Sequence, residues 1–144
     1  MQILQEFATN PISPEQLAAA ACHDVVEDTQ VSIDLVESML GSKVAHLVGW
    51  LTDVSKPSDG NRRVRKQMDL DHTAAAPAEA KSVKLADLIS NSRSIVAHDP
   101  DFARVYLHEK SRVLDVCGDA DPGLLAEARR VLDESRLRLI ANRG

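Results

Sequence analysis

The sequence predicts an all-α domain, and three observations lead to this prediction. Aromatic residues make up only 3% of the 144 residues although hydrophobic residues reach 44%, so the core must consist of Leu, Val, Ile and Ala. Such a core suits packed helices better than a β-sandwich, in which β-branched and aromatic residues are enriched. Apolar residues recur at helical spacing, and no segment alternates convincingly between apolar and polar residues. We expect a single compact domain over residues 1–144, a bundle of about seven to eight helices.

Capping and turn signals divide the chain into these helices. The run Ser13-Pro14-Glu15-Gln16 is typical of a helix start, with Ser13 as N-cap and Gln16 placed to complete a capping box. The Ala-rich helix that follows is apolar on nearly all faces, so we expect it to be buried. Gly41 is expected to end one helix and Ser42 to cap the next, and residues 56–60 form the clearest loop. The expected helices cover about residues 2–9, 14–28, 33–40, 43–53, 61–76, 78–97, 100–118 and 122–139.

Charge and composition exclude several classes of protein. The net charge is −5, whereas a dedicated nucleic-acid binder is usually basic. Cys22 and Cys117 have no CxxC spacing, which argues against a disulfide framework or a zinc ribbon. No apolar run approaches the ~20 residues that span a bilayer, and the first residues do not resemble a signal peptide. We therefore expect a cytoplasmic protein with neither nucleic acid nor a membrane as partner.

The adjacent pair His23–Asp24 is the first candidate for chemistry, because it follows a helix that is apolar on nearly all faces. Burying an ionisable pair costs several kcal/mol unless something compensates. A divalent cation compensates well, since imidazole and carboxylate are both good ligands for Mn, Fe or Zn. The alternative is a histidine hydrogen-bonded to its neighbour at a helix end, and taken alone the dipeptide does not decide between them.

A second carboxylate strengthens the metal hypothesis. Asp87 interrupts a segment of core-forming residues, and Lys84, Asp87 and Asn91 share one stripe of a helix. Asp87 could then bring a second carboxylate to the metal, with Lys84 and Asn91 directed toward the same cavity. The alternative, a surface ion pair between Lys84 and Asp87, is the weaker interpretation.

Two further charged segments fit a phosphohydrolase. Glu27 and Asp28 follow the first pair by one helical turn, and acidic groups there can orient a water at a metal or take its proton. Four of the five residues 62–66 are basic, and Arg93 lies further along, which suits a phosphate-rich small molecule. A frayed helix end and a solvated helix face are the respective alternatives.

Together these motifs are recognisable. Leu17–Thr29 (LAAAACHDVVEDT) resembles the HD motif of the RelA/SpoT-type alarmone hydrolases, and Val83–Asp87 (VKLAD), with Asn91 and Arg93, resembles their second signature. The two motifs occur in the family's order, about sixty residues apart, within a similar helical pattern. The resemblance covers about residues 3–106 and is strongest to the small stand-alone hydrolases that lack a synthetase domain.

The resemblance implies an HD-superfamily phosphohydrolase that removes the 3′-pyrophosphate of (p)ppGpp in a manganese-dependent reaction. His23, Asp24 and Asp87 would ligate the metal, and Glu27 and Asp28 would position or activate the attacking water. The expected substrate contacts are Asn91, Lys84, Arg62 and Tyr106.

One feature of that family is not found in this sequence. Its metal site normally has another histidine near the N-terminus, in a His-Pro-x-x-Val-Ala setting, and no histidine precedes Ser13 here. A shortened N-terminus is the explanation we favour, because the helix near residue 3 begins without a cap. The others are a different ligand, with His46, His72 or water as candidates, and an inactive copy. Apolar surface exposed by a lost helix could be covered in a homodimer.

Two other functions remain open at this level. The first is an HD phosphohydrolase that acts on another nucleotide, since the base pocket cannot be read from the sequence. The second, from a different class, is a catalytically inactive module that binds a nucleotide or regulates a relative.

Overall fold

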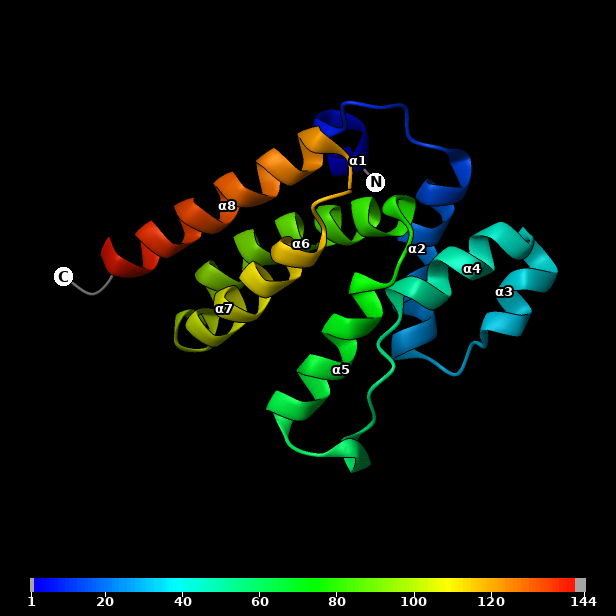
Figure 1. Cartoon of the computed structure of the whole chain (residues 1–144), viewed down its shortest axis with the longest axis horizontal. Coiled ribbons are helices and arrows are strands. Elements are labelled where there is room, and N and C mark those ends of the chain that lie inside the picture. The colour runs from blue at the N-terminus through cyan, green and yellow to red at the C-terminus, as the bar shows by residue number, and fades with distance from the viewer. Residues whose placement is uncertain (1, 142–144) are drawn as a thin grey trace.

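The computed structural model describes residues 2–141, and within that range it holds eight α-helices, one short 3-10 helix and no strand (Figure 1). The expected all-α bundle is therefore confirmed. The helices are α1 (Gln2–Phe7), α2 (Pro14–Asp28), α3 (Ile33–Leu40), α4 (Ser42–Leu51), α5 (Arg62–Ala74), α6 (Ala78–His98), α7 (Pro100–Val116) and α8 (Pro122–Ala141), with the 3-10 helix η1 (Pro57–Asp59) before α5.

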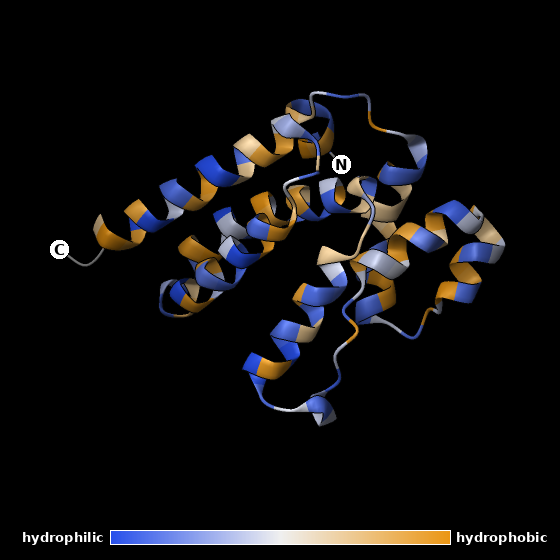
Figure 2. Ribbon diagram, viewed as in Figure 1, coloured by the Kyte–Doolittle hydropathy of each residue, from blue (hydrophilic) through white to orange (hydrophobic). Residues whose placement is uncertain are grey.

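Helix α6 is the centre of the bundle. It packs against α7 and α8 along one part of the molecule and against α1, α2 and α4 along another (Figure 1). Its buried residues lie on nearly all sides of its first three turns, and the orange bands of Figure 2 follow this segment. A helix surrounded in this way holds its polar side chains at fixed positions relative to the other helices.

Helix α2 begins with the expected capping box, since Gln16 N donates to the Ser13 hydroxyl and Ser13 N donates to the Gln16 side-chain oxygen. The expectation that it is buried on nearly all faces is wrong. Its buried residues, Gln16, Ala19, Ala20 and His23, form one stripe, whereas Ala21 and Val25 are exposed. Helices α4 and α6 cover only that stripe, and an exposed alanine or valine is common at protein surfaces.

The turn between α3 and α4 also differs from the expectation in one detail. Gly41 ends α3 as expected, with a φ of 95° that favours glycine. Ser42 does not cap the next helix but is its first residue, and Gly41 takes the N-cap position without a side-chain hydrogen bond. Helix α4 then ends at Leu51, and the loop expected at residues 56–60 contains η1.

Asp121 fastens the start of α8 to the connection between α1 and α2. Its carboxylate accepts hydrogen bonds from the backbone N–H groups of Thr9 and Asn10, both at 2.8 Å, and from those of Gly123 and Leu124. A Cβ at Gly123 would lie 2.1 Å from the carbonyl oxygen of Phe7, so glycine is required at this close approach. Desolvation by itself would raise the pKa of Asp121, but the four donors outweigh it and the pKa is lowered.

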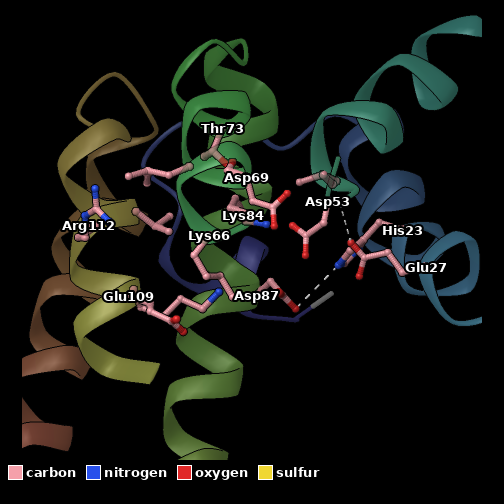
Figure 3. Close-up of a pocket in the computed structure, with 14 residues that line it drawn as sticks. His23, Glu27, Asp53, Lys66, Asp69, Thr73, Lys84, Asp87, Glu109 and Arg112 are labelled. Carbon is pink, nitrogen blue, oxygen red and sulfur yellow. Dashed lines mark hydrogen bonds and ion pairs between the residues drawn. The ribbon is translucent and has the colours of Figure 1, made fainter. Parts of the chain in front are cut away.

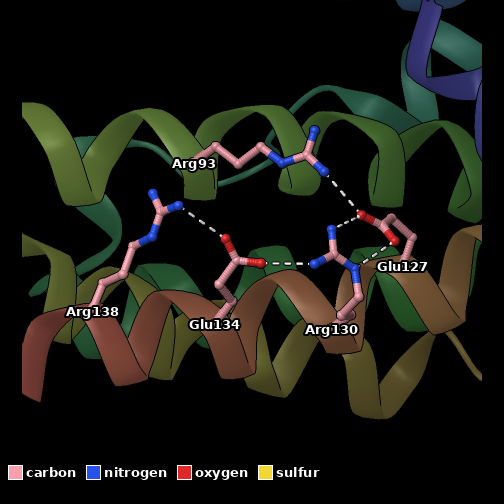
Figure 4. A network of polar contacts seen from close by, with 5 residues as sticks. All are labelled: Arg93, Glu127, Arg130, Glu134 and Arg138. Atoms are coloured by element: carbon pink, nitrogen blue, oxygen red, sulfur yellow. Dashed lines mark hydrogen bonds and ion pairs between the residues drawn. The ribbon is translucent and has the colours of Figure 1, made fainter.

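A salt-bridge network crosses from α6 to α8 (Figure 4). Arg93 on α6 and Arg130 on α8 both bind the largely buried carboxylate of Glu127, and Glu134 links Arg130 to Arg138. The Arg130 guanidinium is the main cause that lowers the pKa of Glu127. Arg93 also lies 5.9 Å from the centre of the Phe7 ring. This arginine therefore holds helices together.

Among the helices of residues 2–141, none combines the length and the apolar character that crossing a bilayer requires.

We predict that Asp121→Asn lowers the free energy of unfolding at pH 7 by about 1–3 kcal/mol, because an amide nitrogen cannot accept the backbone N–H groups that the carboxylate accepts. Since folding lowers the pKa of Asp121, the carboxylate's contribution is complete above the unfolded pKa of about 3.9. It is lost as the pH falls through the folded pKa. Urea titrations at pH 7 and at low pH measure both effects.

Asp133→Asn is the matched control, because Asp133 is an exposed carboxylate on the same helix. Its effect should stay within about 0.5 kcal/mol at every pH. Equal stabilities of the Asp121→Asn variant and the wild type would contradict the role of this carboxylate as a fastener.

Candidate functional site

His23 lies near the end of α2 with its side chain turned into the protein, and the residue is only 4% exposed. Its Nδ1 lies 3.0 Å from the carbonyl oxygen of Ala20. A carbonyl can only accept, so Nδ1 carries the hydrogen. In the neutral ring the lone pair is then on Nε2, which lies 3.1 Å from Asp24 Oδ1 and 3.9 Å from Asp87 Oδ1. The backbone thus directs Nε2 toward two carboxylates.

This group has the chemistry of a metal site. Ligand atoms of His23, Asp24 and Asp87 all lie within 4.8 Å of one another. A lone pair and two negatively charged oxygens repel one another at such distances, and a divalent cation among them removes that repulsion. A hydrogen bond from the other ring nitrogen to a backbone carbonyl is also typical of metal-binding histidines. The residues therefore fit a divalent cation bound by one nitrogen and two oxygens.

The apolar helix before the pair predicts that both members are buried, and this prediction is wrong for Asp24. The side chain of Asp24 is 64% exposed, whereas that of His23 is 6% exposed and that of Asp87 is 26% exposed. Successive residues of a helix point about 100° apart, so the residue after a buried histidine turns toward solvent. Asp24 closes the group from its solvent side.

The structure turns the two other candidate histidines away from this group. His46 Nε2 accepts a hydrogen bond from the Trp50 indole at 3.1 Å, and His72 Nε2 lies 3.0 Å from the carbonyl oxygen of Gly49. The His72 ring stacks on Trp50, with 4.9 Å between ring centres. Neither histidine belongs to the ligand group that the described residues form.

A cavity of about 160 Å³ adjoins the ligand group (Figure 3). Residues from α2, α4, α5, α6 and α7 and from the loop after α4 contribute to its walls. The charged or polar residues that line it are His23, Glu27, Asp53, Lys66, Asp69, Thr73, Lys84, Asp87, Glu109, Lys110 and Arg112. Leu51, Leu70 and Val113 supply the apolar part of the lining.

Of the two acidic residues expected to act on water, the structure brings one to the cavity. Glu27 lines it, one helical turn after His23, and Oε1 accepts a hydrogen bond from Asp53 N at 3.2 Å. Partial burial, and then the charge of Asp53, raise the pKa of Glu27, although that hydrogen bond and Lys84 oppose them. Asp28 is exposed at the last position of α2 and does not line the cavity.

Of the four residues expected to contact the substrate, only Lys84 lines the cavity. Asn91, two helical turns after Lys84 on α6, is exposed and is not part of the lining. Arg62 donates two hydrogen bonds of 2.9 Å to Glu109 and covers the Phe102 ring, outside the lining.

Tyr106, the fourth, is half-buried, and its hydroxyl is enclosed without a hydrogen-bond partner among the described residues. Burial and the charge of Asp87 raise the pKa of this hydroxyl. The ring itself lies 5.1 Å from Lys110 Nζ. Tyr106 therefore supports a residue of the cavity wall.

The sequence reasoning missed several residues of the cavity. Asp69 and Thr73 follow Lys66 at i+3 and i+7 on α5, so helical spacing could have grouped them with this lysine. Lys110 interrupts an apolar pattern between Leu107 and Val113, which is the same signal that singled out Asp87. Asp53 lies in a loop, where spacing gives no information about direction.

Comparisons with known proteins identify relatives of the same kind as the resemblance implied. No family model matches the chain. The guanosine-3′,5′-bis(diphosphate) 3′-pyrophosphohydrolase MESH1 of Drosophila melanogaster is 37% identical over 84 residues, which are 58% of this chain and 45% of that protein. MESH1 of Danio rerio is 37% identical over 87 residues, 60% of this chain and 47% of that protein. The chain thus spans about half the length of the curated relatives it matches.

Solved structures extend the likeness to most of the fold. A protein described as a metazoan ortholog of SpoT that hydrolyzes ppGpp superposes with a TM-score of 0.74 and 28% identity, over 85% of this chain and 70% of that one. A protein of Listeria monocytogenes EGD-e gives the same TM-score over 92% of this chain and 88% of that one, at 19% identity, so it supports the fold alone. The helix arrangement is therefore shared with a ppGpp hydrolase.

We predict that a saturating concentration of Mn²⁺ raises the Tm of the wild-type protein by about 5 °C or more, since a ligand at 100 times its Kd stabilises the folded state by about 2.7 kcal/mol. In Asp24→Asn the rise should largely disappear, because the variant lacks one charged metal ligand. The substitution should not disturb folding, since the Asp24 side chain is exposed. Differential scanning fluorimetry measures this.

Asp34→Asn, an equally exposed change on α3, serves as control and should keep the full rise. A rise of the same size in the Asp24→Asn variant would show that the metal binds elsewhere.

Proposed function

We propose that this chain, a homologue of the MESH1-type HD hydrolases, is a metal-dependent 3′-pyrophosphohydrolase of ppGpp or a compound closely similar to it. Residues 1–144 would form one hydrolase domain. Manganese is the metal we propose, although a histidine nitrogen and two carboxylate oxygens also accept other divalent ions. The cytoplasmic location, the absence of nucleic-acid and membrane partners and the homodimer stay predictions.

One observation carries this proposal: His23 and Asp87, two members of the ligand group, line the same cavity as three lysines (Figure 3). A metal site for activating water and cations for holding phosphate are the two requirements of phosphate-ester hydrolysis. Both occur here within a cavity of about 160 Å³. The sequence relatives carry this same activity in their names.

The reaction is the addition of water across a phosphorus–oxygen bond. The oxygen of a water attacks the phosphorus joined to the ribose 3′-oxygen, and the bond between that phosphorus and O3′ breaks. The water loses a proton and O3′ gains one. The products are pyrophosphate and a nucleoside 5′-diphosphate with a free 3′-hydroxyl. When bound, the metal supplies charge that makes the water more acidic and stabilises the reacting phosphate.

The residues of the chain have separate roles in this reaction. Glu27 holds the attacking water and accepts its proton, since partial desolvation raises the pKa of this carboxyl above its ordinary value and makes it a stronger base. The Asp53 N–H hydrogen bond fixes one oxygen of Glu27 and leaves the other for the water. Lys84, which also lines the cavity, binds phosphate oxygens of the substrate.

A second candidate is hydrolysis of another nucleotide, and the composition of the cavity wall favours it in one respect. Among residues 2–141, the cavity lining contains no Phe, Tyr or Trp. A stacked base is a common way to recognise guanine, so the walls bind phosphate groups without specifying the base. A panel of ppGpp, NADPH and nucleoside monophosphates separates these candidates by the rate of phosphate or pyrophosphate release.

We predict that the wild-type protein with Mn²⁺ releases pyrophosphate from ppGpp and that Glu27→Gln lowers kcat by about 10²–10⁴-fold, because an amide cannot accept the proton of water. The Mn²⁺-dependent rise of Tm should be unchanged in this variant, since Glu27 is not a metal ligand. Phosphorus NMR follows the products.

Glu37→Gln on α3 is the matched control for loss of a carboxylate and should keep wild-type kcat, as Glu37 is exposed away from the cavity. Wild-type turnover in Glu27→Gln would refute its role as base. A wild-type protein that binds Mn²⁺ but releases no phosphate from any compound of the panel would refute the enzymatic proposal.

A further inference from the structure

The loop of residues 52–56, which joins α4 to η1, is held in place by carboxylates. Its successive backbone N–H groups at residues 53–56 all donate to the side chain of an aspartate or a glutamate. Asp53 and Val54 are both exposed, so apolar packing contributes little to fixing this backbone. The position of the loop therefore depends on the acidic side chains that accept its hydrogen bonds.

Asp69 on α5 binds the middle of this loop with both of its carboxylate oxygens. Oδ1 accepts from Val54 N and Ser55 N, both at 3.0 Å, and Oδ2 accepts from the Ser55 hydroxyl at 2.7 Å. Hydrogen bonds to an ionised acceptor are roughly twice as strong as those between neutral groups. The side chain of Asp69 lines the cavity, but its two oxygens are engaged by the loop.

The helix that carries Asp69 is also held against the end of α4, where the loop begins. His72 follows Asp69 by about one turn of α5, and its Nε2 lies 3.0 Å from the carbonyl oxygen of Gly49. The His72 ring stacks on Trp50, with 4.9 Å between ring centres. Because α5 and the end of α4 are packed together in this way, Asp69 has a fixed position relative to the first residues of the loop.

The same loop carries the N–H group that holds Glu27. Asp53 N donates to Glu27 Oε1 at 3.2 Å, and Figure 3 shows Asp53 between Asp69 and Glu27. Asp53 directly precedes the two residues whose N–H groups Asp69 binds, and successive Cα atoms are fixed about 3.8 Å apart. A carboxylate that fixes Val54 and Ser55 therefore leaves the Asp53 N–H little freedom to turn away from Glu27.

We propose that Asp69 is a positioning residue: through the loop it holds the Asp53 N–H against Glu27 and so directs the Glu27 carboxylate at the attacking water. The catalytic part of this inference rests on the proposed function, in which Glu27 takes the proton of water. The linkage from Asp69 to Asp53 does not depend on any reaction. A misplacement of about 1 Å can lower turnover about 10²-fold, so the effect of losing this linkage is measurable.

The first test is backbone amide hydrogen exchange in the full chain without substrate, followed by NMR. In Asp69→Ala the amides of residues 53–55 should exchange at least about tenfold faster than in the wild type. The Asp53 amide is decisive, because its hydrogen bond goes to Glu27 and not to Asp69. Asp71→Ala is the matched control: Asp71 is an exposed carboxylate on the same helix that accepts from Gln67, and its loss should leave the three rates unchanged.

The second test is turnover of ppGpp with Mn²⁺. Asp69→Ala should lower kcat about 10–100-fold and change KM by less than about threefold, because the aim of the base is lost while substrate contacts remain. Asp71→Ala should keep the wild-type kcat. In a Glu27→Gln background, Asp69→Ala should lower kcat by no more than about twofold further, since a residue that acts through Glu27 has no base left to position.

Asp69→Asn keeps one acceptor oxygen at the same place and carries both tests, with smaller effects, if Asp69→Ala does not fold. An unchanged exchange rate of the Asp53 amide in the Asp69 variants overturns the linkage. A full additional loss of kcat in the Glu27→Gln background overturns the action of Asp69 through Glu27. A wild type that hydrolyses no compound of the panel refutes the proposed function and the catalytic part with it, whereas the exchange rates decide the linkage independently.

Discussion

The site depends on the contact of α2 with α6, because His23 and Asp87 are far apart in the sequence and meet only through it. The buried stripe of α2, which α4 and α6 cover, contains Ala19 and Ala20, whose small side chains allow neighbouring helices to approach closely. Gln16 adds a specific link: its side chain completes the capping box of α2 and also donates to the carbonyl oxygen of Glu79 on α6, at 3.1 Å. The helix start that the local sequence specifies is thereby tied to the helix that carries Asp87.

The same contact determines the electrostatics. Since α6 is enclosed by its neighbours, Asp87 and Lys84 are held one turn apart on the side that faces the cavity. Backbone donors and Arg62 engage the acidic side chains on the facing segments. The cavity wall therefore presents both carboxylates, which suit a cation, and lysines, which suit an anion. A substrate that carries phosphate groups and reacts at a metal meets both requirements.

Much of the fold could be predicted, because its signals are local. The capping box at Ser13, the glycine turn at Gly41 and the Asp-Pro helix starts near residues 99 and 121 all depend on neighbours in the sequence. The spatial meeting of His23, Asp24 and Asp87 also follows from the motifs quoted, and the structure brings these residues together.

The rest of the site depends on partners distant in the sequence. Four basic residues in a run of five suggest a phosphate site, but the pattern cannot show that Arg62 is bound by Glu109, 47 positions away. Lys110 enters the cavity only because α7 packs against α5 and α6. Asp24 and one face of α2 are exposed because other helices cover only part of α2. The local sequence does not indicate which part is covered.

We infer that a divalent cation binds between α2 and α6, held by His23, Asp24 and Asp87. Anomalous diffraction from a crystal soaked in Mn²⁺, recorded on both sides of the manganese absorption edge, tests it directly. We expect one strong manganese peak in contact with His23 Nε2 and with oxygens of both aspartates. A map with no peak there, or with manganese bound only at other carboxylates, would contradict it.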